Sequence, residues 1–124
     1  GPFAVDSRLL PHFVPNAAVR LTVDGRSITY TGDAGPSNDL VELAQGTNVL
    51  VAESTYVESV PPASAGNLNS AVDVGRQASQ AGAARLLLTH LWPGTDPEAA
   101  RAAAERSFRE RVEVALGGLV VDLS

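Results

Sequence analysis

The sequence predicts an α/β domain in which a mixed sheet is covered by helices. From about residue 30 onward, β-prone and helical patterns alternate along the chain, as in sheets whose strands are joined by helices. Two of the β-prone runs, 48–53 and 84–90, are almost continuously aliphatic, which is typical of strands covered on both faces. The chain has 124 residues, so we expect one domain, 1–124, with one core.

The first elements are predicted to be a stiff segment and a hairpin. Residues 3–14 mix apolar and polar side chains, and Pro11 and Pro15 flank His12. Because proline removes a hydrogen-bond donor and restricts φ, the two prolines exclude a regular central strand and hold His12 on an extended, kinked path. Two β-prone runs then surround an Asp-Gly pair, so we expect a hairpin over 18–31.

Three helices are predicted from their caps and apolar spacing. The first begins at Pro36-Ser37-Asn38, which offers a cap, and stops at Gly46. The second follows either Asn69 or Ser70 and stops at Gly82, and the third covers 98–108.

The remaining segments are expected to be irregular or to form edge strands. Residues 57–70 contain Pro61-Pro62 and several small residues, so they predict a loop. Thr95 or Asp96 is expected to cap the third helix, with Pro97 at its first position. At the end of the chain, 112–115 and 119–123 predict a hairpin or paired edge strands.

Composition excludes several classes of function. The chain has no cysteine, so any metal site must use His, Asp or Glu, which suits zinc, manganese or iron. The net charge of −5 argues against a broad nucleic-acid surface. No apolar run reaches the roughly 18 residues of a membrane span, and no signal peptide is visible. We therefore expect a cytoplasmic protein, and the start at Gly1-Pro2 without methionine suggests a processed, tagged or excised piece.

Polar residues end several of the predicted strands. Asp33, Glu53 and His90 each follow or end a β-prone run, and His12 ends another. The carboxyl edge of an α/β sheet is where ligands bind, so two histidines and one aspartate together favour a metal site. Alternatives stay open, because Asp33 can simply cap a turn, Glu53 can be structural, and either histidine can be an ordinary core or surface residue.

The order of these motifs resembles a known family. The chain contains His12-x-Val14-Pro15, then Tyr30-Thr31-Gly32-Asp33, then Glu53-Ser54-Thr55, and finally Leu86-Leu87-Leu88-Thr89-His90. This series looks like the C-terminal half of a metallo-β-lactamase-fold hydrolase, in the branch that holds ribonuclease Z and bacterial cyclic-nucleotide phosphodiesterases. The resemblance covers nearly the whole chain.

The resemblance implies half of a four-layer αββα sandwich. His12 and His90 would each hold one of up to two metal ions, Zn²⁺ or else Mn²⁺ or Fe, and Asp33 would bridge them. The His-x-His-x-Asp-His motif of the family's first half does not occur in these 124 residues. The implied reaction, attack by a metal-bound hydroxide, would therefore need a half that this chain does not contain.

The resemblance also implies a proton relay, and here the sequence departs from it. In the family the glutamate at Glu53 pairs with a histidine that opens the next helix, and that place is taken by Asn67 in Asn67-Leu68-Asn69-Ser70. Asparagine can form hydrogen bonds but cannot deliver a proton as imidazolium does. Protonation of the leaving group would then need water or another group.

The same resemblance also leads to expectations about the substrate and the partner. Only about twenty residues separate His12 from Asp33, so no long basic arm for tRNA lies between them, and a small phosphodiester or ester substrate is expected. One alternative is a non-catalytic binding or assembly domain whose ligand residues are relics. Another is a homodimer, or pairing with the missing N-terminal half, since an isolated half would expose an apolar sheet face.

Overall fold

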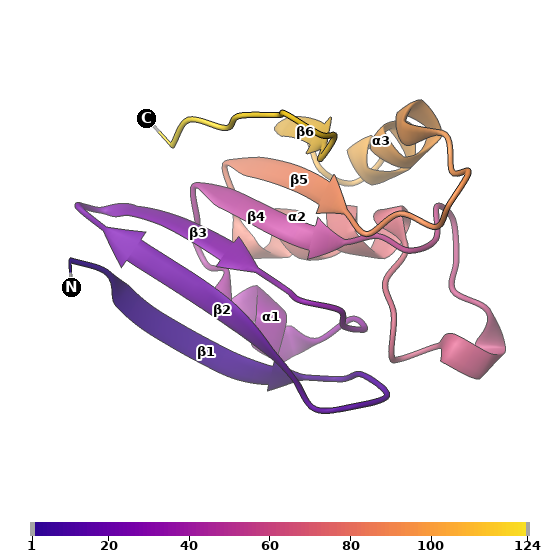
Figure 1. Cartoon of the computed structure of the whole chain (residues 1–124), viewed down its shortest axis with the longest axis horizontal. Helices are drawn as coiled ribbons and strands as arrows, with labels where there is room; N and C mark the ends of the chain where they lie inside the picture. The colour runs from indigo at the N-terminus through magenta and orange to yellow at the C-terminus, as the bar shows by residue number, and fades with distance from the viewer. Residues whose placement is uncertain (1, 124) are drawn as a thin grey trace.

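The computed structural model describes residues 2–123. Six strands form one sheet in chain order: β1 (Ala4–Leu10), β2 (Asn16–Val23), β3 (Arg26–Tyr30), β4 (Val49–Glu53), β5 (Arg85–Thr89) and β6 (Arg111–Val114). The first three strands are antiparallel, and β3 to β6 are parallel (Figure 1). The predicted mixed sheet is thus confirmed.

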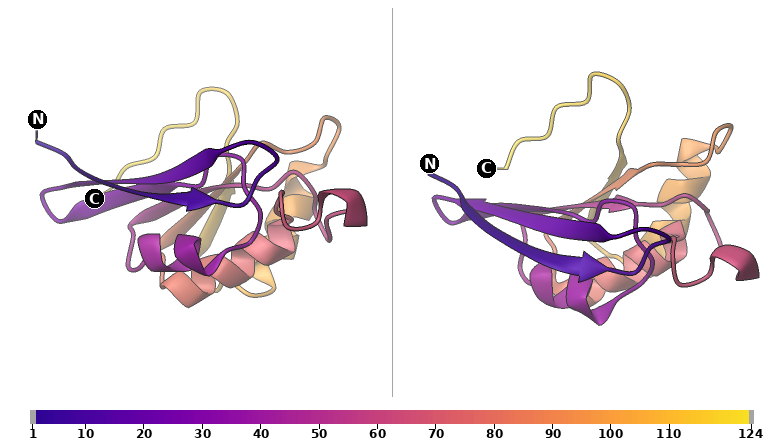
Figure 2. Two further views of the ribbon diagram at one scale, coloured as in Figure 1. Left: turned by 90° about the horizontal axis from the view of Figure 1, so that it is seen from below. Right: turned by 60° about the horizontal axis from the view of Figure 1, so that its bottom comes forward.

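The helices all lie on one face of this sheet (Figure 2). They are α1 (Asn38–Leu43), α2 (Ala71–Ala81) and α3 (Pro97–Glu105), with a short 3₁₀ turn, η1 (Pro62–Ser64), in the loop before α2. The hydroxyl of Ser37 and the hydroxyl of Ser70 accept hydrogen bonds from the first turns of α1 and α2, and the Asp96 carboxylate does the same for α3. Of the alternative caps, Ser70 and Asp96 are therefore the ones used.

The N-terminal part agrees with the expected hairpin. β2 and β3 are joined by Asp24 and Gly25, whose φ angles of 51° and 74° are those of a type I′ turn. β1 is an edge strand that ends at Leu10, immediately before Pro11. The prolines limit the strand as predicted, because β1 stops where the first of them would remove a donor. Residues 12–14 form a bend, so the path at His12 is kinked as predicted but not extended.

Two predictions for the C-terminal part are wrong. Residues 119–123 form no strand, because the chain turns at Gly118, whose φ is 85°, and leaves the sheet on the side away from the helices (Figure 2). β6 instead pairs with β5 in a parallel arrangement. The third helix ends at Glu105 rather than at residue 108, because Phe108 turns inward and is 2% exposed in the core.

The core lies on the helix side of the sheet only. Leu50, Ala52, Leu86 and Leu88 point toward the helices and are at most 1% exposed. On the opposite face, β1 and β3 expose apolar side chains that include Leu9 at 74%. We call this second surface the open face. No helix within residues 2–123 is long and apolar enough to cross a membrane.

Candidate metal centre

Three neighbouring parallel strands bring the predicted site residues to one edge of the sheet. Asp33 lies three residues beyond β3, Glu53 is the last residue of β4, and His90 follows β5 directly. His90 has a φ of 56°, in the left-handed region that non-glycine residues seldom adopt. Such backbone strain is concentrated at functional sites, and here it turns the chain sharply as it leaves the strand.

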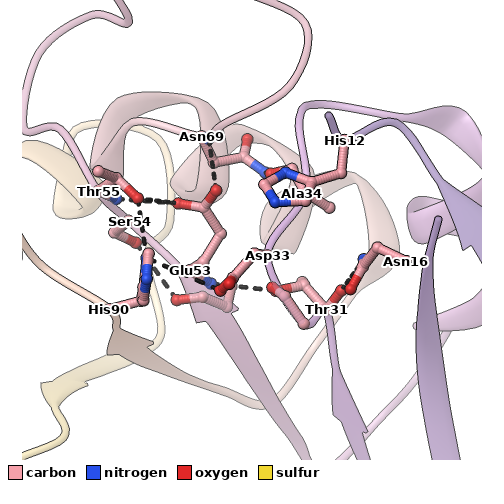
Figure 3. Close-up of polar contacts among 12 residues, drawn as sticks. His12, Asn16, Thr31, Asp33, Ala34, Glu53, Ser54, Thr55, Asn69 and His90 are labelled. Atoms are coloured by element: carbon pink, nitrogen blue, oxygen red, sulfur yellow. Dashed lines mark hydrogen bonds and ion pairs between the residues drawn. The ribbon is translucent and has the colours of Figure 1, made fainter. Parts of the chain in front are cut away.

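Asp33 and His90 meet at this edge, as Figure 3 shows. The Asp33 Oδ1 atom lies 3.7 Å from Nδ1 of His90, and about half of each side chain is exposed, 41% and 51% respectively. The expected convergence is therefore observed for these two residues, which come from the ends of different strands. Both remain accessible to a ligand from solvent.

The hydrogen bonds of His90 determine which ring nitrogen is free. Thr55 Oγ1 donates to Glu53 Oε2 over 2.8 Å and lies 3.0 Å from His90 Nδ1. Since the hydroxyl proton is already donated to the carboxylate, Thr55 accepts from His90, and Nδ1 must carry the hydrogen. The lone pair of His90 then sits on Nε2, which is the usual arrangement for a metal-ligating histidine.

His12 is held in the same tautomer from another part of the chain. Its Nδ1 lies 2.8 Å from the backbone oxygen of Asn67. A carbonyl oxygen can only accept, so Nδ1 carries the hydrogen and Nε2 is free here too. The neighbouring Pro11 oxygen accepts a hydrogen bond from the Gly35 nitrogen over 2.8 Å, which ties the His12 segment to the Asp33 loop.

The donor set fits a divalent cation, although it is incomplete. Two histidines with free Nε2 atoms and one carboxylate are ligands that zinc and manganese accept. Within the described part of the chain, however, no group of three or more His, Cys, Asp or Glu residues lies close enough together to hold an ion. Asp33 lies beside His90 on the Nδ1 side of the ring, and His12 belongs to the segment that Pro11 and Gly35 tie to the Asp33 loop.

The Glu53 carboxylate is fully buried and accepts three hydrogen bonds. They come from the nitrogen and hydroxyl of Thr55 and from the nitrogen of Asn69. Burial raises the pKa of Glu53, and the hydrogen bonds from Thr55 and Asn69 only partly offset this effect. The carboxylate contacts Thr55 and Asn69 rather than Asn67, which holds His12 through its backbone oxygen. Glu53 and Asn67 thus make two separate sets of contacts, and each set orients one part of the site.

The raised pKa of Glu53 predicts a pH-dependent stability difference. Between the ordinary value of 4.5 and the raised value, the folded state binds a proton that the unfolded state has lost, so stability decreases as pH rises. The difference in the free energy of unfolding between the wild type and Glu53→Gln should be largest in favour of the wild type below pH 4.5. It should decrease as the pH rises through the raised pKa of Glu53. Urea unfolding of both proteins from pH 4 to pH 8 measures the difference. A difference that grows with pH would contradict the assignment.

Replacement of Thr55 by valine should release the His90 ring. The variant keeps the side-chain volume but removes the acceptor for Nδ1, so we expect a mixture of tautomers and a roughly 10- to 100-fold loss of Zn²⁺ affinity, as for other partners of metal ligands. Two-dimensional ¹⁵N NMR of the imidazoles reads the tautomer directly. The chain has only two histidines, so the unchanged spectrum of His12 is the control. Persistence of the Nδ1–H form of His90 in the variant would refute the contact.

The sequence indicated which residues lie at the ends of the strands, but it did not indicate which residues orient the side chains of the site. Thr55 was visible in the Glu53-Ser54-Thr55 run, two residues after the carboxylate it contacts. The contact with His90 spans 35 positions, and no local pattern indicates it. Asn69 appeared only as a candidate helix cap, whereas its side chain bonds to the Ala34 oxygen over 2.7 Å.

Comparisons with known proteins agree with the geometry of the fold. No family model matches the chain. It is 31% identical over 120 residues to the probable metallo-hydrolase YhfI of Bacillus subtilis, covering 97% of this chain and 49% of that protein. It is also 36% identical over 102 residues to ribonuclease Z of Myxococcus xanthus, covering 80% of this chain and 33% of the relative.

A solved structure has a similar fold. The metallo-β-lactamase-fold protein YhfI superimposes with a TM-score of 0.89 at 29% identity, over 96% of this chain and 49% of that one. An uncharacterized protein of Mycobacterium leprae is 35% identical over 127 residues, which cover 99% of this chain and 43% of that protein. The chain spans about half the length of the curated relatives it matches. These similarities, with the mixed sheet and its polar carboxyl edge, show that the chain belongs to the metallo-β-lactamase-fold hydrolase family, in the ribonuclease Z branch.

Proposed function

We propose that this chain is the C-terminal half of a metal-dependent hydrolase that acts on small phosphodiesters. The observation that carries the proposal is the shared tautomer of His12 and His90, because each ring is held by Nδ1 and leaves Nε2 free. Asp33 adds a carboxylate beside His90. Metal-ligating histidines are typically oriented in this way by partners on the other ring nitrogen.

In the proposed reaction the chain supplies ligands and orientation. His12, Asp33 and His90 would hold the cation, Zn²⁺ or else Mn²⁺ or Fe, and Thr55 with Glu53 would keep the His90 ring in place. A bound divalent cation supplies Lewis-acid activation of water and of the phosphoryl oxygen. Glu53 has its oxygens engaged by Thr55 and Asn69, so we assign it to orientation, and leaving-group protonation to water or to the other half.

The missing ligands are proposed to come from a second half that packs on the open face. Val5, Leu9 and Tyr30 are 63%, 74% and 45% exposed on that face, although they belong to strands of the central sheet. Apolar sheet surface of this kind favours a partner. An N-terminal half of the same protein would bring the remaining ligands, and a second copy of this chain is the alternative occupant.

A non-catalytic binding domain is the second candidate. It is favoured by Asn67, which stands where the family has a proton-donating histidine, and by the lack of a three-ligand group within residues 2–123. The two candidate functions differ in whether a bound cation leads to hydrolysis.

The deciding experiment compares this chain with the complete product of its gene. Zn²⁺ and Mn²⁺ binding is measured by calorimetry, and hydrolysis of bis(p-nitrophenyl) phosphate is followed by absorbance. Stoichiometric metal with turnover in the complete product supports the hydrolase. Metal binding without turnover, or no metal binding, supports the non-catalytic domain. Sedimentation of the chain alone shows whether a second copy covers the open face.

A further inference from the structure

A buried asparagine, Asn69, contacts both the loop that carries Asp33 and the Glu53 carboxylate (Figure 3). It is 0% exposed, and its side-chain nitrogen donates to the Ala34 oxygen over 2.7 Å. Its backbone nitrogen donates to Glu53 Oε1 over 3.1 Å. Its side-chain oxygen accepts from Gln77 Nε2 over 2.9 Å. The residue therefore joins the loop after β3, the end of β4 and helix α2.

Two chains of hydrogen bonds start at Asn69, and each leads toward one member of the Asp33–His90 pair. The first reaches the carbonyl of Ala34, the residue that directly follows Asp33. The second starts at the backbone nitrogen of Asn69 and runs through Glu53 and Thr55 to the Nδ1 atom of His90. We propose that Asn69 is a positioning residue that sets the placement of Asp33 relative to His90. As a statement about metal affinity, this rests on the function proposed above.

Gln77 of helix α2 holds both Asn69 and the loop that follows Asp33. Gln77 is 3% exposed, and its side-chain oxygen accepts from the backbone nitrogen of Ser37 over 3.1 Å. The loop from Asp33 to Ser37 is thus held at both ends by neighbouring amides, one from Asn69 and one from Gln77. Removing one partner of a buried hydrogen bond destabilises the folded state, because the other partner is left without a hydrogen bond and without water, so any other position of the loop is disfavoured.

A matched control lies at the opposite end of the sheet. Thr47 is also 0% exposed, and its hydroxyl bonds to Thr29 and to the Val49 oxygen over 3.0 Å and 3.2 Å. Thr47→Val and Asn69→Leu both replace a buried polar side chain by an apolar one of similar volume. If Asn69 contributes only to the overall stability of the domain, both variants should have the same consequences at the candidate metal centre.

The test compares Asn69→Leu with Thr47→Val in two measurements. Amide hydrogen exchange reports the protection of Gly35 and Ser37, and calorimetry with Zn²⁺ reports affinity. We expect Asn69→Leu to lower the protection of both amides at least about 10-fold and to weaken Zn²⁺ binding roughly 10- to 100-fold. Thr47→Val should leave both within about two-fold. Gln77→Leu is the second variant, for the case that Asn69→Leu does not fold, and it should lower the protection of Ser37 most.

The outcomes separate this proposal from the proposed function. Equal effects of the variants on the Gly35 and Ser37 amides, or no effect of Asn69→Leu and Gln77→Leu, would overturn the positioning role. If the wild type binds no Zn²⁺, the metal-dependent function fails for this chain. The exchange comparison then still decides whether Asn69 places the Asp33 loop.

Discussion

Replacement of Asp33 by asparagine should weaken Zn²⁺ binding by more than the roughly 10- to 100-fold that changes to the partners of ligands cost. The substitution keeps the shape of the side chain but removes the negative charge that compensates a dication. It also replaces one of the two carboxylate oxygens with an amide nitrogen, which is a donor and cannot ligate a cation. The fold should be unaffected, because the Asp33 side chain is 41% exposed and lies outside the core.

Asp6→Asn is the matched control for this experiment. Asp6 is exposed on the edge strand β1, so the substitution makes the same change in net charge away from the site. Calorimetric titration of both variants with Zn²⁺, in this chain and in the complete product of its gene, measures the effect. Equal affinities of wild type and Asp33→Asn would remove Asp33 from the ligand set.

Gly35→Ala should destabilise the protein by roughly 3 kcal/mol, at the upper end of overpacking effects. A Cβ atom on residue 35 would overlap the carbonyl of Gly66 and would lie 2.9 Å from the nitrogen of Asn67. Both neighbours are backbone, so no side chain can rotate away. The loop that carries Asp33 would have to separate from the segment that holds His12 through the Asn67 oxygen.

The measurement is chemical unfolding of Gly35→Ala beside Gly117→Ala. Neither glycine has a positive φ, and a Cβ atom at Gly117 would meet no neighbour within 4 Å. The control should therefore change the free energy of unfolding by less than about 0.5 kcal/mol, as surface substitutions usually do. A loss of stability at Gly35 no larger than that of the control would show that the two segments can separate freely.

Much of the fold could be predicted because its signals are local. The Asp24-Gly25 pair predicted the hairpin, and the aliphatic runs predicted the buried strands β4 and β5. Caps predicted the starts of the helices, since a serine or aspartate before a first turn satisfies donors within three residues. Residues 119–123 were predicted wrongly because their apolar character suits a strand, while a strand also needs a partner that only the folded sheet provides.

What the sequence by itself determined is that Asp33, Glu53 and His90 follow neighbouring parallel strands, because strand order and direction place their ends at one edge. Only the tertiary structure decided which nitrogen of each histidine is free, since Thr55 and Asn67 lie 35 and 55 positions away from the rings they hold. Only the tertiary structure, too, placed Asn69 between Ala34 and Glu53. Hydrogen bonds of this kind depend on atoms brought together by the packing of the whole domain, and no periodicity along the chain encodes them.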